Sequence, residues 1–480
     1  MTFESLNPVT DEVVGTHPVH TAQQVDAAVA RARTAAGWWA DLGFAGRAER
    51  LTRWKGVLTR RAADLAEVVS AETGKPHADA MLEIILAVDH TAWAARNAPK
   101  VLGRKRRPSG LLMANQTARV EYLPLGVVGV IGPWNYPVFT PMGSIAYALA
   151  AGNPVVFKPS EYTPGVGQWL AETFASVVPE HPVFQLITGF GETGAALCRS
   201  GVDKIAFTGS PGTGKKIMAT CAETLTPVLI EAGGKDALLV DSDADLEAAA
   251  DAAVWGGISN AGQTCVGIER VYVHSAVYDK FVSLVVDKAR AVEPGKQIGP
   301  ITMPSQVAII RGHIADALSR GGRALVGGNG SGRFVEPTVL VDVPEESSAV
   351  QEETFGPTLT VTKVASMDEA ITKANNTRYG LGGAVFSRAN GPALARRLRA
   401  GMVSINSVIS FAGIPSLPFG GTGDSGFGRI HGPEGLREFA RPQATTHQRF
   451  RAPLTLTSFT RPEKTDTRVA KLITLLHGRR

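Results

Sequence analysis

The most constraining feature of the chain is a regular alternation of short apolar runs and helical segments between residues 126 and 231. The runs have the length of strands and lie at residues 127–131, 155–157, 183–187, 205–207 and 228–230. Because parallel strands need a crossover connection, usually a helix, this order predicts βαβ units around a parallel sheet that is covered on both faces. Ligands on such sheets bind at the carboxyl ends of the strands, so a site is expected in the turns that follow the runs.

A second set of strands and helices follows residue 233. The pattern predicts helices at 244–256 and 277–292 and strands at 270–273, 339–341, 359–364, 383–386 and 403–405. Residues 23–98 carry apolar side chains at helical spacing, and residues 118–123 alternate as an exposed or interface strand does. A chain of 480 residues exceeds the size of one hydrophobic core, which agrees with two α/β domains.

The composition excludes several classes of protein. A hydrophobic fraction of 44% with 19% charged residues is typical of a globular protein, and the first residues lack a secretory pattern, so we expect a cytoplasmic location. The only cysteines, Cys198, Cys221 and Cys265, form no CxxC pair, which argues against a disulfide framework and against a metal site built from cysteines, and we expect no metal. The net charge of +5 is small, and we expect no nucleic-acid partner.

Two side chains indicate nucleophilic catalysis. Cys265 lies among small residues at 260–267, where a ligand can reach a thiol. Glu231 ends an apolar run and precedes Gly233 and Gly234, where a carboxylate could activate the water that resolves a covalent intermediate. Each residue has a simpler explanation, because a free cysteine is commonly a small core residue and a glutamate at a strand end is commonly solvated.

Asn135 lies between two prolines in the turn after the first apolar run. A side-chain amide held in this way could act with the backbone amide of Cys265 as an oxyanion donor. The alternative is a turn asparagine that satisfies its own backbone.

Two further turns supply candidate binding residues. Lys158 and Glu161 could hold sugar hydroxyls, and the carboxylate would repel a 2′-phosphate and so favour NAD over NADP; the alternative is a surface salt bridge. Gly209 and Ser210 precede a helix whose first amides attract phosphate, and Pro211 suits its first turn. An ordinary glycine-rich cap is the alternative there.

These segments, in this order, resemble the NAD(P)-dependent aldehyde dehydrogenase superfamily over about residues 5–450. The sequences Glu-Glu-Thr-Phe-Gly-Pro at 352–357 and Pro-Phe-Gly-Gly at 418–421 belong to the same resemblance. It implies that Cys265 attacks an aldehyde, that Glu231 activates water to hydrolyse the thioester, and that Asn135 is the oxyanion donor. It also implies that a pyridine dinucleotide is held by Trp134, Lys158, Glu161, Gly191, Gly209, Ser210, Glu353 and Phe355.

The resemblance and the strand pattern together predict an aldehyde dehydrogenase-like α/β fold with two parallel-sheet domains and a small β element for oligomerisation. The expected NAD-binding domain, Rossmann-like, comprises residues 1–104 and 126–232, and the expected catalytic domain comprises 233–436. Residues 105–125 and 437–453 form the expected bridging element of a homodimer or homotetramer, and 454–480 form a C-terminal tail.

Three readings of function stay open. We favour oxidation of a small-molecule aldehyde to the acid with NAD and water. A CoA-acylating relative would use the same cysteine, but such enzymes generally lack the glutamate found here at position 231. A non-catalytic structural or binding protein on the same scaffold would not need the candidate residues Cys265, Glu231, Asn135, Lys158 and Glu161 together. Ala232 departs from the leucine usual in the family.

The tail has a periodicity of its own. Val469, Leu472, Ile473 and Leu476 form one apolar stripe on a helix that carries basic residues. We favour docking on the protein's own dimer over attachment to an anionic membrane surface, because so short a stripe buries little area.

Overall fold

The computed structural model describes residues 1–328, 330–452 and 457–478. Its chain divides into two compact units, which are described separately. The larger unit comprises Met1–Leu102 and Pro124–Arg441, and the smaller comprises Gly103–Leu123 and Pro442–Arg480. Arg479 and Arg480 of the basic tail lie outside the described residues.

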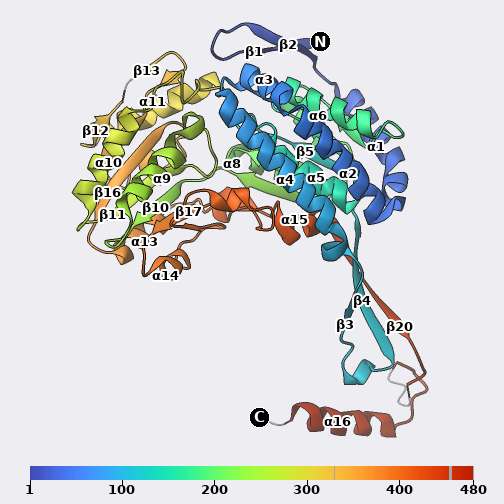
Figure 1. Ribbon diagram of the computed structural model, residues 1–480. Coiled ribbons are helices and arrows are strands. Elements are labelled where there is room, and N and C mark those ends of the chain that lie inside the picture. Colours follow the sequence, from blue (N-terminus) through green and yellow to red (C-terminus); the bar gives the residue numbers. More distant parts are fainter. Residues whose placement is uncertain (329, 453–456, 479–480) are drawn as a thin grey trace. The chain divides into compact units, whose positions relative to one another are not determined.

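The first sheet of the larger unit has six strands and contains the five predicted from the apolar runs (Figure 1). Their order is β19 (Gly426–Phe427), β9 (Val228–Ala232), β8 (Lys204–Gly209), β5 (Val128–Ile131), β6 (Val155–Lys158) and β7 (Phe184–Leu186). The pairs from β9 to β7 are parallel, as predicted. The edge strand β19 was not predicted, and it runs antiparallel to β9.

Helices cover both faces of this sheet. They are α1 (Ala22–Asp41), α2 (Gly43–Arg60), α3 (Ala62–Thr73), α4 (His77–Leu102), α5 (Phe139–Ala151), α6 (Pro164–Val177), α7 (Gly191–Arg199) and α8 (Pro211–Ala222). Val156 of β6 belongs to one apolar cluster with α1 and α8, whereas its neighbour Phe157 contacts Phe184, whose ring touches Trp54 of α2. Because neighbouring side chains of a strand point to opposite faces, α1 and α2 lie on opposite sides.

The chain begins with a hairpin that the sequence pattern did not reveal. It consists of β1 (Thr2–Leu6) and β2 (Val13–Pro18), paired antiparallel. Its strands are mostly exposed, so they lack the apolar run by which the buried strands were found.

The second sheet of the larger unit has seven strands. Their order is β12 (Arg323–Val326), β15 (Thr338–Val341), β16 (Thr358–Val364), β11 (Ile268–His274), β10 (Asp236–Val240), β17 (Gly383–Phe386) and β18 (Ser404–Ile405). All pairs are parallel except β12 with β15. The five predicted strands are present, but two were missed: the edge strand β12, and β10, which lies between β11 and β17 and whose residues are buried.

Helices also cover this sheet on two faces. Alternate residues of β10, Leu238 and Val240, pack with α9 (Leu246–Ile258), α10 (Tyr278–Arg290) and α11 (Pro304–Ser319). Ala237 and Leu239 face α13 (Met367–Asn375) and α14 (Gly391–Ala395) instead. The remaining short elements of the larger unit are β13 (Gly330–Ser331), β14 (Phe334–Val335), α12 (Ser348–Gln351), α15 (Gly432–Glu438) and the 3-10 turns η2 (Ser259–Gly262), η3 (Ser410–Gly413) and η4 (Gly423–Ser425).

The smaller unit is built on a three-stranded sheet. Its order is β20 (Ala440–Gln448), β4 (Gln116–Pro124) and β3 (Lys105–Arg107), and it also holds the turn η1 (Leu111–Met113) and the helix α16 (Lys464–His477). The exposed strand predicted at 118–123 and the helix predicted from the tail stripe are both present. In the described ranges, none of the helices combines the length and apolar character needed to cross a bilayer.

Candidate active site

A cleft of about 740 Å³ opens in the larger unit at the carboxyl ends of β5, β6, β8 and β9. This position agrees with the expectation for parallel sheets. All predicted site residues line this one cleft, although they come from distant parts of the chain: Trp134, Asn135, Lys158, Glu161, Gly191, Gly209, Ser210, Glu231, Cys265, Glu353 and Phe355.

The loop that carries Cys265 is held in an unusual backbone conformation. Asn260 and Ala261 have φ values of 52° and 53°, in the left-handed region that side chains disfavour. The loop is pinned by Gln263, whose side-chain amide donates to the carbonyl oxygen of Asn260 at 2.9 Å and accepts from the backbone amide of Thr302 at 2.8 Å. Such a conformation persists only where its surroundings impose it, and here it presents the next turn to the cleft.

The thiol of Cys265 faces a negative environment. Cys265 is half-buried, whereas Cys198 and Cys221 are buried. Burial raises the pKa of the Cys265 thiol well above its ordinary value, and the nearby carboxylates of Glu231 and Glu353 raise the pKa further. Both effects oppose ionisation of the thiol, so a positive charge in the cleft would favour the nucleophilic thiolate.

Glu231 lies on β9 and is only 2% exposed, which contradicts the solvated alternative. No hydrogen bond of ordinary geometry reaches its carboxylate oxygens among the described residues, although the side chains of Cys265 and Thr208 lie close enough to lower its pKa. Burial raises the pKa of Glu231 to about 7. A carboxylate with a pKa near neutrality is suited to take a proton from water and to give it up again.

Asn135 does not satisfy its own turn. Its side-chain Nδ2 donates to the carbonyl oxygen of Gln263 at 2.9 Å, so it is tied to the Cys265 loop. This bond uses one of the two N–H groups of the amide, and a second donor remains for a ligand. From the other side, the buried Lys75 donates to the carbonyl oxygen of Asn135 at 2.7 Å and pairs with Glu83 at 2.8 Å.

The far end of the cleft has the features of a phosphate and sugar site. Ser210 caps α8, accepting from the backbone amide of Thr213 at 3.3 Å, and both residues line the cleft. Free amides at a helix N-terminus attract phosphate. Lys158 is buried, not part of a surface salt bridge, and its ammonium donates to the carbonyl oxygen of Pro159 at 3.0 Å. Burial lowers the pKa of Lys158, although Glu161 opposes this effect.

Another part of the cleft wall is formed by Trp134, Glu353 and Phe355. The rings of Trp134 and Phe355 meet edge to face with centroids 5.5 Å apart. Glu353 accepts a hydrogen bond from the backbone amide of Gly234 at 3.1 Å, and a Cβ at Gly233 would lie 1.9 Å from its carboxylate. Gly233 therefore leaves the space that Glu353 occupies, and Gly234 supplies the hydrogen bond to its carboxylate.

Comparisons with known proteins agree with this site. A model of the aldehyde dehydrogenase family matches residues 1–445. The chain belongs to the aldehyde dehydrogenase family. The 4,4'-diapolycopene aldehyde oxidase of Methylomonas sp is 36% identical over 460 residues, which cover 94% of this chain and 87% of that protein.

Solved structures of aldehyde dehydrogenases share the fold. The NAD-dependent aldehyde dehydrogenase of Sinorhizobium meliloti superposes with a TM-score of 0.91 at 34% identity, covering 95% of this chain and 93% of that one. An NADP-dependent enzyme of E. coli superposes with a TM-score of 0.89 at 32% identity, covering 93% and 95%. The chain is thus an enzyme that oxidises aldehydes to acids, and its relatives include users of either dinucleotide.

Sequence reasoning missed several residues that line the cleft of this aldehyde dehydrogenase. They include Lys216 on α8, Gln306 on α11 and Tyr379, none of which lies in a turn after a predicted strand. The sequence could have indicated Lys216, because it lies about one helical turn after the predicted phosphate-binding start of α8. Among the residues that the structure describes, no group of three or more His, Cys, Asp or Glu side chains could hold a metal ion.

Proposed function

We propose that the protein oxidises an aldehyde to the carboxylic acid with NAD and water, through a thiohemiacetal and a thioester on Cys265. The observation that carries the proposal is the shared cleft, where a thiol and a buried carboxylate of raised pKa lie together. Cys265 Sγ would attack the aldehyde carbon, and Asn135 Nδ2 would donate to the oxygen that becomes negative. Glu231 would then take a proton from the water that hydrolyses the thioester.

The residues present fit a dinucleotide. Its phosphates would be held by the start of α8 and its adenosine ribose by Lys158 and Glu161, with Glu353 and Phe355 on the nicotinamide side. When bound, it supplies a hydride acceptor whose positive charge offsets the carboxylates around Cys265. The buried carboxylate of Glu231, which no hydrogen bond of ordinary geometry reaches among the described residues, supports a role toward a water molecule or substrate bound in the cleft.

We further propose a preference for NAD over NADP. Glu161 lines the cleft beside Lys158, and its carboxylate would repel a 2′-phosphate. Lys216 lines the same cleft, and its ammonium would attract a 2′-phosphate. Substitutions of Glu161 and of Lys216 should therefore change the cofactor preference in opposite directions. Initial rates should be higher with NAD than with NADP, and Glu161→Ser should reduce the ratio of the two rates. A wild-type preference for NADP that is lost in Lys216→Ser would refute the assignment.

The decisive test of the reaction is product analysis with and without CoA. Purified protein is incubated with NAD and a panel of short, long-chain, aromatic and acidic aldehydes, and NADH is followed by absorbance. The free acid should form without CoA, because Glu231 is available to activate water. Acyl-CoA formed only in the presence of CoA would favour the acylating alternative, and no NADH with any aldehyde would favour a non-catalytic protein.

We propose a homodimer or homotetramer that is assembled through the three-stranded sheet, in the cytoplasm. The outer strands β20 and β3 are the edges of this sheet, and an edge strand presents unpaired backbone groups to a further strand. We also propose roles for the predicted domains. Residues 1–104 and 126–232 bind the cofactor, residues 233–436 carry the nucleophile, and residues 105–125 with 437–453 form the contacts between subunits. Sedimentation that shows only monomer at micromolar concentration would contradict this assembly.

A further inference from the structure

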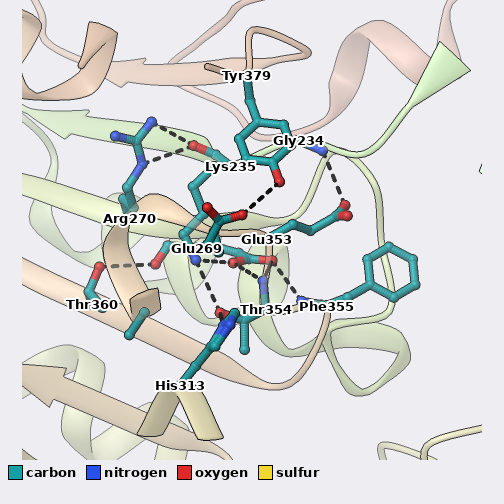
Figure 2. A network of polar contacts seen from close by, with 12 residues as sticks. Gly234, Lys235, Glu269, Arg270, His313, Glu353, Thr354, Phe355, Thr360 and Tyr379 are labelled. Atoms are coloured by element: carbon teal, nitrogen blue, oxygen red, sulfur yellow. Dashed lines mark hydrogen bonds and ion pairs between the residues drawn. The ribbon is translucent and has the colours of Figure 1, made fainter. Parts of the chain in front are cut away.

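A buried ion pair lies next to the cleft without lining it. Lys235 follows the two glycines after Glu231, and Glu269 stands four residues after Cys265 (Figure 2). Their side chains are 0% and 5% exposed, so both charges have lost their water. A pair of this kind is tolerated only where further hydrogen bonds satisfy it.

Those hydrogen bonds come from the backbone of one loop. The carboxylate of Glu269 accepts from the amides of Thr354 and Phe355, each at 2.9 Å. Lys235 Nζ donates to the hydroxyl of Thr354 at 3.1 Å. Figure 2 shows both side chains directed at Thr354. The ion pair therefore binds the segment that carries two predicted cofactor contacts.

The backbone conformation of the loop at Thr354 and Phe355 is not one that its own residues prefer. Phe355 has a φ of 50°, in the left-handed region, which is unfavourable for a bulky side chain. Such a conformation persists where surrounding contacts impose it. The two amide bonds to Glu269 are contacts of this kind, since they fix the peptide groups on both sides of Thr354.

The geometry divides the loop into two sides. Thr354 is buried against the ion pair, whereas Glu353 and Phe355 line the cleft. The ion pair is itself anchored from behind, because the guanidinium of Arg270 donates to the carbonyl oxygen of Lys235 at 2.6 and 2.9 Å. A displacement at Glu269 would therefore reach both Glu353 and Phe355.

We propose that Lys235 and Glu269 are positioning residues that hold Glu353 and Phe355 in place for the nicotinamide half of the dinucleotide. The inference rests on the proposed function, because it takes the dinucleotide as the ligand of this part of the cleft. The pair touches neither the thiol nor the base, so it acts on hydride transfer and cofactor affinity and leaves the chemistry of Cys265 and Glu231 intact.

The test compares Glu269→Gln with the wild-type enzyme. The carboxylate accepts from the Thr354 amide through both oxygens, at 3.1 and 2.9 Å, and from the Phe355 amide through one of them. The amide of glutamine has one acceptor atom and no charge, so at least one of these three bonds is lost and the others are weakened. The Kd for NAD should rise about tenfold, as expected for the loss of a charge-assisted hydrogen bond. With deuterated aldehyde, a primary isotope effect on kcat should appear, since misplaced cofactor slows hydride transfer.

A second activity separates positioning from general damage. Hydrolysis of p-nitrophenyl acetate needs attack by the Cys265 thiolate, loss of p-nitrophenolate and hydrolysis of the thioester, but no hydride acceptor. Glu269→Gln should retain this esterase activity within about twofold, the spread expected for a group that does not touch the reacting atoms. An equal loss of esterase and dehydrogenase activity would overturn the proposal.

Two further variants complete the experiment. Glu438→Gln removes the carboxylate from another largely buried pair, with Lys204 at 2.5 Å, and should leave the Kd for NAD unchanged. Thr354→Val keeps the ion pair but removes the hydroxyl that Lys235 binds, so it tests the Lys235 contact with the same loop if Glu269→Gln does not fold. A wild-type Kd for NAD in a folded Glu269→Gln or Thr354→Val protein would refute the inference, whereas absence of NAD-dependent oxidation by the wild type would refute the proposed function.

Discussion

Replacing Glu231 by glutamine tests both the chemistry and the energetics of its buried carboxylate. Burial raises the pKa of Glu231 from 4.5 to about 7. In the unfolded chain the group returns to its ordinary pKa, so between about pH 4.5 and 7 the native state binds more protons than the unfolded state. Stability therefore falls as pH rises through this window. The difference of about 2.5 pKa units, 7 minus 4.5, corresponds to about 3 kcal/mol above pH 8.

Glu231→Gln has no such titration. The unfolding entropy of a chain of 480 residues is about 1 kcal/mol per kelvin. When the pH is raised from 5 to 8.5, the Tm of the variant relative to that of the wild type should therefore increase by about 2.5 °C. A cost of burying the glutamine amide shifts the Tm equally at both pH values and cancels. Other buried acids, such as Asp236, are common to both proteins. Calorimetric melts of the two proteins without cofactor provide the measurement.

Activity should respond to pH in the opposite direction. Wild-type turnover should rise through about pH 7, because only the ionised carboxylate takes a proton from water. The variant should give a rapid burst of NADH and then a slow steady state, since the thioester accumulates. Equal pH dependence of Tm in the two proteins would refute the burial argument, and unchanged steady-state turnover would remove Glu231 as the base.

Two further substitutions and one deletion have equally specific outcomes. Cys265→Ser should lower turnover by about a thousandfold or more while calorimetric titration shows NAD binding intact, because a serine hydroxyl is far less ionised than a thiol; near-normal turnover would exclude Cys265. Asn135→Ala should lower kcat by about a hundredfold, or about 3 kcal/mol, with little change in KM for NAD; a loss confined to KM would argue against an oxyanion donor. Deleting residues 461–480 should lower Tm or alter chain-length preference while oxidation of a small aldehyde continues. Salt-sensitive binding to anionic vesicles that disappears on deletion would favour the membrane interpretation of α16 over docking.

Local sequence signals determined much of the fold. The apolar runs of the first sheet predicted five strands because a strand buried on both faces must be apolar throughout. Ser210 and Pro211 predicted the start of α8 because capping needs only residues that are neighbours in the chain. The hairpin of β1 and β2 escaped prediction, since its exposed strands carry no apolar run.

The candidate catalytic residues of the cleft likewise followed from the sequence, but their physical properties did not. Cys265, Glu231 and Asn135 were recognisable in their motifs, whereas the pKa of Glu231 depends on what covers the carboxylate. Burial is a property of the assembled fold, so the solvated alternative for Glu231 could be rejected only in three dimensions.

Only the tertiary structure decided which groups hold the reacting residues in place. Lys235 meets Thr354 across 119 positions of the chain, and Lys75 meets Asn135 across 60. Nothing in the local sequence of either lysine distinguishes a buried, paired ammonium from a solvated one, because pairing depends on the distant loop that supplies the acceptors. The sequence thus determined which chemical groups the site contains, and the packing of distant segments determined their protonation, their orientation and their support.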